Sequence, residues 1–402
     1  MFELHNDQRY SKELKEIIIQ MIQMDPGQRP DSCILFKQFK ALYIQYYSKN
    51  TGIYSAIQCL FSFQNIMDYF SDSFKLGEIM GTEYKKKVSL IMIGIKDLIK
   101  DNKNEDENIY YLRQILCEQG INKKDNEEIT PFETINIIIN SLNYELNEKK
   151  PYKTKNNYFH SKIPSGNEKE IYKAFIQKNT QIFRSIISKD FARYFALSRT
   201  CQKCSQKIYS FEKFHYIHFD LDFVESQNNF ASINIYDCFN CLNKSTIYLD
   251  KTKRIKCTSC NKITDQIERK SFYQIKKNLI IMIDRGENNN NNRKIDFEET
   301  IKFNKTQVEK SNDKEYTLVG VISVIEYNGK EKYIAFIKKN GENSWRKYDD
   351  GKEIKNVDFD RVMNEGMVIS LFYYNYDELE KLFTLNNMSI NTNNNNSSAV
   401  RG

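Results

Sequence analysis

Four cysteines are the side chains whose type and spacing most clearly specify chemistry. They form two Cys-x-x-Cys pairs, Cys201 with Cys204 and Cys257 with Cys260. Each pair can present two thiolates from one tight turn, and two such turns complete the tetrahedral four-sulfur shell of a structural zinc site. Zinc is therefore the metal ion that these four residues are predicted to bind, and four reduced thiols without a metal are the alternative.

A third pair, Cys238 and Cys241, is a weaker candidate for metal binding. A second ion would need two further ligands, and only His215 and His218 lie nearby in the sequence. On an alternating strand, an i, i+3 spacing would point these two histidines to opposite faces. Ordinary packing of Cys238 and Cys241 is therefore favoured over a second metal ion.

Helical patterns precede strand patterns along the chain, and these elements must position the cysteines. Apolar residues at helical spacing predict helices over 52–72, 83–100, 108–119 and 130–146. Alternation predicts strands over 214–223, 279–283, 316–324, 332–338 and 367–374, with loops over 150–170 and 288–292. This order favours an α+β fold.

Composition narrows the class of protein. The chain has 402 residues, 40% of them hydrophobic, which is enough for a substantial core, and its net charge of +7 is not gathered into a basic block. Nucleic acid is therefore not favoured as a partner. Paired cysteines favour a reducing compartment. Without a signal peptide or an apolar run near about 20 residues, we expect no membrane association and an intracellular protein, cytoplasmic or nuclear.

Residues 1–36 form a separate segment. A helical pattern is followed by Asp25-Pro26-Gly27-Gln28-Arg29-Pro30, which resembles the end of a protein kinase C-lobe, with Arg29 as the matching arginine. The kinase phosphate-binding and catalytic motifs are absent, so no kinase activity is expected. The resemblance implies a remnant of a kinase module in a longer fusion, and a simple helix-turn-helix is the alternative. At the other end, residues 386–402 are rich in Asn and Ser and are predicted to be disordered.

Seven segments in a fixed order resemble the ubiquitin-specific proteases, which are papain-like ubiquitin carboxyl-terminal hydrolases. The resemblance covers about 42–376 and implies a helical thumb, zinc-bearing β fingers at about 196–285 and a β palm. The matching segments are Ser55–Leu60, Pro131–Leu146, the two outer cysteine pairs with the strand and short helix between them, Leu279–Arg285, Tyr316–Ile322, Trp345–Asp350 and Leu371–Tyr373.

The same resemblance locates the catalytic positions, and three of the four carry the wrong residue. Thr51 stands at the position of the nucleophilic cysteine, Tyr46 at that of the oxyanion-stabilising Asn, and Lys332 at that of the general-base His; only Asp349 is retained. Cys59 lies about 12 Å along the predicted helix from Thr51, at about 1.5 Å per residue, and is expected to be a core residue.

The expected function follows from these replacements. Thiol hydrolysis needs a cysteine thiolate, an imidazole base and a carboxylate that orients it. Asp349 would keep Lys332 charged and unable to act as a base. We therefore predict a pseudo-deubiquitinase with no active catalytic residues, which binds ubiquitin, a ubiquitinated protein or another protein partner. The alternatives are an active cysteine-type deubiquitinase and a zinc-binding scaffold or nucleic-acid-binding protein.

Overall fold

The computed structural model describes Asp31, Ile34 and most of residues 50–376. Within that span it leaves out 73–86, 102–105, 122, 124–126, 149–166, 228–231, 244, 249–254, 258, 265, 287–288, 305–306, 311–313, 328 and 350–351. The kinase-like segment with Arg29, the position Tyr46 and the tail 386–402 therefore lie outside the described residues. Among the helices described, none is both long and apolar enough to span a bilayer.

Five helices lie between residues 51 and 145 of the described chain. They are α4 (Thr51–Phe61), α5 (Gln64–Tyr69), α7 (Lys87–Asp101), α8 (Asp106–Glu118) and α9 (Pro131–Glu145). Their buried apolar faces share one core with part of a large β-sheet. The start of α9 is specified locally, because Thr130 and Glu133 form a reciprocal capping box and Pro131 occupies the first turn.

The predicted helix over 52–72 is wrong as one continuous element. It is split between α4 and α5, where Ser62 Oγ donates to the carbonyl of Cys59 at 2.6 Å and Phe63 takes an extended backbone conformation. The fully buried Phe63 ring packs edge-on against Phe191 and also contacts Phe372. The helical spacing of apolar residues does not indicate this break, because Phe63 is apolar and fits the pattern of buried residues whether its backbone is helical or extended.

Several of the described helices were not predicted, among them α10 (Glu168–Ile182) and α11 (Ile186–Asp190). α10 begins inside the segment expected to be a loop, with the side chain of Asn167 capping its first turn, and α11 follows it. α10 packs Ile171, Tyr172 and Phe175 on the face of a β-sheet. Its many charged and polar residues conceal this narrow apolar stripe in the sequence.

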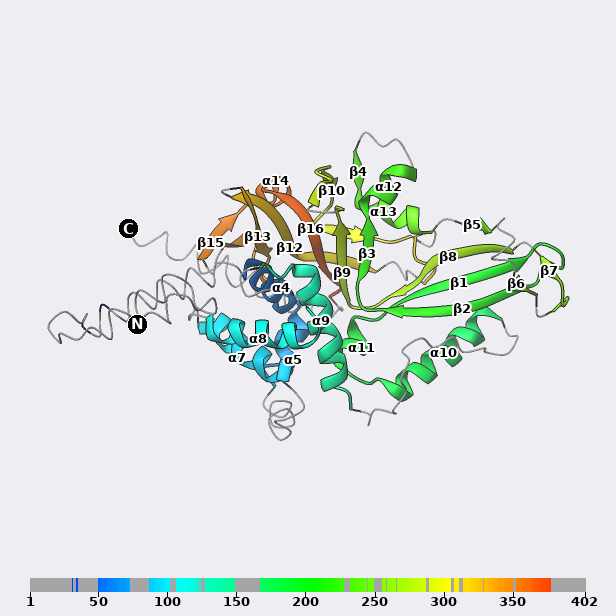
Figure 1. Ribbon diagram of the computed structural model, residues 1–402, viewed down its shortest axis with the longest axis horizontal. Helices are drawn as coiled ribbons and strands as arrows, with labels where there is room; N and C mark the ends of the chain where they lie inside the picture. Colours follow the sequence, from blue (N-terminus) through cyan, green and yellow to red (C-terminus); the bar gives the residue numbers. More distant parts are fainter. Residues whose placement is uncertain are drawn as a thin grey trace, which may run out of the picture.

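A four-stranded antiparallel sheet projects from the helical part of the molecule (Figure 1). Its order is β2-β1-β8-β5, formed by β2 (Lys207–Phe214), β1 (Arg193–Cys201), β8 (Gln266–Ile275) and β5 (Ser245–Tyr248). At its far end lies the hairpin of β6 (Ile255–Lys256) and β7 (Ile263–Thr264). The two outer cysteine pairs are therefore carried at the tip of this sheet.

A larger sheet of eight strands follows the order β15-β14-β13-β12-β16-β9-β3, with β11 pairing β12. Its strands are β3 (Ile217–Asp220), β9 (Asn278–Asp284), β11 (Thr300–Lys302), β12 (Glu315–Tyr327), β13 (Lys330–Ile337), β14 (Trp345–Asp349), β15 (Lys352–Val357) and β16 (Met367–Tyr374). Among the described strands of this sheet, β3 and β9 pair in parallel and the other pairs are antiparallel. The shorter elements are α12 (Leu221–Gln227), β4 (Ile233–Asn234), α13 (Ile235–Leu242), β10 (Ile295–Asp296) and α14 (Phe359–Asn364).

The strand predicted over 214–223 is too long at both ends. Phe214 ends β2, and the chain leaves β3 at Asp220 to enter α12. The Asp220 carboxylate accepts the backbone N–H of Phe223 at 2.9 Å, which starts the helix. Phe219 and Leu221 are both buried, so apolar alternation continues past the point where hydrogen bonding changes.

Arg193 lies where the two sheets and the helical part meet. Its guanidinium is buried and donates to the carbonyls of Phe191, at 2.6 Å, of Asn278, at 2.5 Å, and of His215. Burial lowers its pKa to about 9. One side chain therefore joins the start of β1, the end of α11, the start of β9 and the turn between β2 and β3.

The start of α4 is also held in one position by close packing. A Cβ at Gly52 would lie 2.1 Å from the carbonyl oxygen of Ile129, which is too close for any side chain. At the other end of α4, Cys59 and Ser62 pack against Gly320 on β12. A Cβ at Gly320 would lie 3.2 Å from Cys59 Sγ and 3.2 Å from Ser62 Oγ. Glycine at both positions lets α4 approach the segment before α9 and the sheet.

We expect Gly52→Ala to lower the free energy of unfolding by about 1–3 kcal/mol, because the added methyl overpacks against backbone that has no alternative rotamer. The matched control is Gly94→Ala in α7, where the new Cβ meets only the Asn108 side chain, at 3.1 Å from Oδ1. That variant should stay within about 1 kcal/mol of the parent chain, since alanine favours helix. Urea denaturation of both variants tests this, and equal stabilities would contradict it.

Candidate functional site

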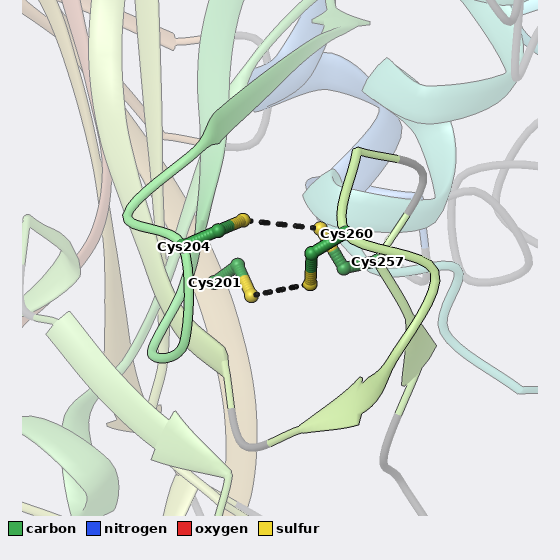
Figure 2. A group of neighbouring side chains, drawn as sticks. All are labelled: Cys201, Cys204, Cys257 and Cys260. Atoms are coloured by element: carbon green, nitrogen blue, oxygen red, sulfur yellow. Dashed lines mark hydrogen bonds between the residues drawn. The ribbon is translucent and has the colours of Figure 1, made fainter.

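The four outer cysteines converge on one point (Figure 2). Their sulfur atoms all lie within 4.8 Å of one another, with 3.9 Å between Cys201 Sγ and Cys260 Sγ and 3.6 Å between Cys204 Sγ and Cys257 Sγ. A tetrahedral ion with metal–sulfur bonds of about 2.3 Å requires sulfurs about 3.8 Å apart. The four thiols therefore have the arrangement of a closed metal centre.

The two turns that carry these thiols have the same backbone design. In each, the residue after the second cysteine, Ser205 or Asn261, has a positive φ of 57° or 60° and donates its N–H to the carbonyl of the first cysteine at 2.9 Å. The backbone N–H groups of Cys260 and Ser259 lower the pKa of the Cys257 thiol. At Cys204 the backbone N–H of Gln206 also lowers the thiol pKa, but burial and hydrogen bonds with the other three cysteines outweigh it and raise that pKa to about 12. Backbone N–H groups thus favour the thiolate at Cys257, and a bound cation would favour it at all four sulfurs.

Cys238 and Cys241 take no part in this cluster. Both are buried on α13, and burial, together with the charges of Cys241 and Asp237, raises the pKa of Cys238 to about 12. Over the ranges that the structure describes, the four outer cysteines are the one group placed to hold a metal ion. The interpretation of Cys238 and Cys241 as packing residues agrees with this placement.

Thr51 begins α4, and its hydroxyl takes part in two hydrogen bonds. Thr51 Oγ1 donates to Glu128 Oε1 at 3.1 Å and accepts the backbone N–H of Tyr333, also at 3.1 Å. The N–H of Gly52 donates to the same Glu128 oxygen at 2.7 Å. Thr51 as a whole is buried, with 4% of its surface exposed. Its proton is directed to a carboxylate, which is a much weaker base toward a hydroxyl than an imidazole is toward a thiol.

Lys332 and Asp349 are brought together as a salt bridge. Lys332 Nζ lies 2.5 Å from Asp349 Oδ1, and Lys347 Nζ lies 3.0 Å from the other carboxylate oxygen. Burial by itself would raise the pKa of Asp349, but hydrogen bonds and charge from Lys332 and Lys347 lower it. An ionised Asp349 favours the ammonium form of Lys332, which cannot accept a proton.

Lys347 extends this network of ion pairs to the end of α14. Its ammonium also lies 2.6 Å from Glu365, and Glu365 in turn pairs with Arg361 at 2.6 Å. The retained carboxylate is therefore one member of a chain of ion pairs that links β13, β14 and the end of α14. Such a network of ion pairs holds neighbouring strands together.

Cys59 is a core residue, as predicted. Its side chain is fully buried, with Sγ 3.7 Å from the carbonyl of Val321, and burial raises the pKa of the thiol well above its ordinary value. A thiol in such surroundings is protonated and inert.

A pocket of about 540 Å³ opens beside the Thr51 position. One part of its wall comes from Glu128, which precedes α9, and from Pro131 and Phe132 in the first turn of α9. Another part comes from Glu331 and Tyr333 on β13. His218 was not predicted to lie here, yet it lines the same pocket, with Nε2 3.4 Å from Asp284 Oδ2. Glu128 was also missed, because its importance depends on contact with α4, far away in the sequence.

Comparison with known proteins bears on this site and fold. The model of the family described as ubiquitin carboxyl-terminal hydrolase matches residues 49–373. A SAGA DUB module that contains Ubp8, Sgf11, Sus1 and Sgf73 gives a TM-score of 0.56 at 19% identity, over 82% of this chain and 68% of that one. A search of curated proteins finds no match to this chain.

Two other solved structures of that module are similarly close. The module bound to monoubiquitin gives a TM-score of 0.55 at 16% identity, over 87% of this chain and 77% of that one. The yeast module with a variant Sgf73 gives 0.52 at 16% identity, over 87% and 76%. At such low identities, these structures establish a shared fold.

We expect the purified chain to retain metal and Cys204→Ser to lose it, because three thiolates no longer close the tetrahedral shell. Cys117→Ser is the matched control, since Cys117 lies on α8 outside the cluster. Elemental analysis after gel filtration measures the metal content of each protein. Equal metal content in the two variants would contradict a centre at the four outer cysteines.

We expect Asp349→Asn to destabilise the chain near neutral pH by about 1 kcal/mol or less, allowing for solvent screening of this partly exposed group. Because the pKa of Asp349 is lower in the folded chain than in the unfolded chain, the unfolded chain is protonated first as the pH falls. The stabilisation is thus fully present above the ordinary Asp value of 3.8 and is lost as the pH falls through the lower folded pKa. Urea denaturation across the acid range should show the two proteins converging; a constant gap down to the lowest pH would exclude this ion pair as its source.

Proposed function

Because the chain belongs to the ubiquitin carboxyl-terminal hydrolase family, we propose that it is a pseudo-deubiquitinase, which binds ubiquitin or a ubiquitinated protein without hydrolysing it. The α+β fold of this family is present, with a helical thumb (α4–α9), β fingers (β1, β2, β5 and β8 with the β6–β7 hairpin) and a β palm (the eight-stranded sheet). The proposal concerns what this fold still does when its catalytic positions are changed.

The observation that carries the proposal is the set of contacts around Thr51. The hydroxyl and the adjacent Gly52 N–H are both engaged by the Glu128 carboxylate. A hydrolase needs a nucleophile with a nearby base, and donors that are available to a developing oxyanion. At this position the nucleophile is a hydroxyl, and the helix N–H that could serve an oxyanion already has an anionic partner.

The base position supports the same proposal. Lys332 is held against Asp349 in its charged form, so the retained carboxylate stabilises an ion pair. The described histidines are His215 and His218, and neither belongs to β13 or β14. His218 faces the pocket, but its carboxylate partner is Asp284 on β9.

Ubiquitin remains a suitable ligand when the chemistry is removed. In this family the fingers and palm hold the globular part of ubiquitin, and a channel receives its Gly-Gly tail. The pocket beside Thr51, with walls from thumb and palm, has the position that such a channel requires. The SAGA DUB module of similar fold has been solved bound to monoubiquitin and to ubiquitin aldehyde, which supports ubiquitin as the ligand class.

Zinc is the proposed metal of the four-cysteine centre, because thiolate ligands in a closed tetrahedral shell are its usual protein environment. When bound, it would supply structure alone, joining the end of β1 to the β6–β7 hairpin. A thiolate centre of this kind is maintained in reducing surroundings, and we propose an intracellular location, cytoplasmic or nuclear. A kinase module in a longer fusion is a prediction from residues 1–36.

We expect the full chain to bind ubiquitin saturably and to leave a fluorogenic ubiquitin conjugate uncleaved. Calorimetric titration and a fluorescence assay measure the two properties on one preparation. Turnover, or capture of a thiol by a reactive ubiquitin probe, would overturn the proposal in favour of an active deubiquitinase. Absence of both binding and turnover would overturn it in favour of a scaffold that keeps only the fold.

A pair of variants localises the binding. Phe132 is 39% exposed in the first turn of α9 and lines the pocket, whereas Tyr144 is 60% exposed at the other end of the same helix. Phe132→Ala should weaken ubiquitin binding by roughly tenfold or more, the size of effect seen when an aromatic interface anchor is removed. Tyr144→Ala should bind as the parent chain does if the ligand lies over the pocket.

A further inference from the structure

Glu128 is held in place from both directions along the chain. The carbonyl of Glu127 accepts a hydrogen bond of 2.6 Å from Arg113 Nη2, and Arg113 Nη1 also donates to Asn50 Oδ1 at 2.9 Å. Two residues after Glu128, Thr130 caps α9. The segment is therefore tied to α8, to the residue before α4 and to the start of α9, so the carboxylate is aimed by the fold.

The target of this carboxylate is the first turn of α4. The amino end of a helix carries unpaired N–H groups and a partial positive charge, and it favours an anion. Here the N–H of Gly52 and the hydroxyl of Thr51 both donate to Glu128 Oε1, at 2.7 Å and 3.1 Å. The anion that this helix end can hold is thus already supplied by the protein.

The neighbouring cations have partners of their own, including Lys123, which lines the pocket and whose Nζ lies 4.0 Å from Glu133 Oε1. Lys332, next to Tyr333 in β13, pairs with Asp349 at 2.5 Å. Arg285, which also lines the pocket, is buried and donates to the carbonyls of Val368, Asn291 and Arg293. A second anion that reaches Thr51 would meet a fixed carboxylate, with these nearby positive groups already bound to other partners.

We propose that Glu128 makes this site select ubiquitin whose terminal carboxyl is joined in an amide bond over free ubiquitin. The inference rests on the proposed function, in which the end of the Gly-Gly tail lies beside Thr51. Free ubiquitin ends in a carboxylate, which would be repelled by Glu128 and would find the local donors taken. Conjugated ubiquitin presents a neutral amide at the same point and avoids that repulsion.

This assignment gives the altered site a biological use. A working hydrolase must release free ubiquitin as its product, whereas a binding protein that recognises conjugates must avoid saturation by free ubiquitin. A single carboxylate at the end of the tail channel provides this discrimination without contact to the modified protein. The repulsion between Glu128 and the terminal carboxylate of free ubiquitin weakens binding of that ligand, and disfavouring a competitor is a common way to obtain specificity.

The test compares three probes against the full 402-residue chain. They are free ubiquitin, ubiquitin whose terminal carboxyl is converted to a primary amide, and ubiquitin lacking its Gly-Gly tail. We expect the amide to bind about tenfold more tightly than free ubiquitin, the effect of two like charges a few ångströms apart in a half-buried site. Added salt should narrow the difference.

Two variants assign the effect to one carboxylate. Glu128→Gln keeps an oxygen that can accept from Gly52 but removes the charge, so the amide and the free form should bind equally. Glu127→Gln is the matched control, because it removes the same charge one residue away, on a side chain that lines the same pocket. It should retain the preference. Thermal melts show whether each variant is folded.

Each result has one meaning for the proposal. Equal binding of amide and free ubiquitin to the parent chain would overturn the selectivity and leave the proposed function standing. Binding of none of the three probes would overturn both. A preference that persists in folded Glu128→Gln would overturn the role of this carboxylate. The parent-chain comparison decides the selectivity even if Glu128→Gln does not fold.

Discussion

The buried guanidinium of Arg193 is the interaction on which the arrangement of the molecule depends. It satisfies carbonyl groups at the end of α11, the turn before β3 and the start of β9, while belonging to the first residue of β1. Burial of a charge without a carboxylate partner is costly, and several backbone carbonyls offset that cost here. Because these carbonyls belong to α11, to the turn before β3 and to β9, the guanidinium fixes the start of the finger sheet against the rest of the molecule.

Neighbouring amides reinforce the same junction. Asn278 Nδ2 donates to Asn65 Oδ1 at 3.1 Å, and Asn65 Nδ2 donates to Asp190 at 2.8 Å. The thumb helix α5 is therefore connected through side chains to the strand β9 and to α11. A ligand gripped between fingers, palm and thumb needs these three parts at fixed angles, and the buried polar contacts provide this without any contribution from the catalytic positions.

The positions that the family resemblance equates with catalytic residues make structural contacts in this fold. Thr51 and Glu128 join the start of α4 to the segment before α9 and to β13, while Lys332, Asp349 and Lys347 join neighbouring strands of the palm. Each polar group in these sets has acquired a partner of opposite charge or a hydrogen-bond donor. A site built for turnover keeps strained or unsatisfied groups for its substrate, and satisfying them favours stability over reactivity.

The sequence by itself determined the fold class, the order of thumb, fingers and palm segments, and the cysteine tetrad. These follow from periodicity, from short ligand spacings and from ordered motifs, all of which are local in the chain. It did not reveal the break at Phe63 or the end of β3, because apolar residues are buried on either side of each boundary. It did not reveal the helix α10 either, because charged and polar residues conceal its narrow apolar stripe. Nor could it indicate Glu128 and His218. Their meaning depends on contacts with Thr51 and Asp284, residues remote in sequence, and only the tertiary structure brings them together.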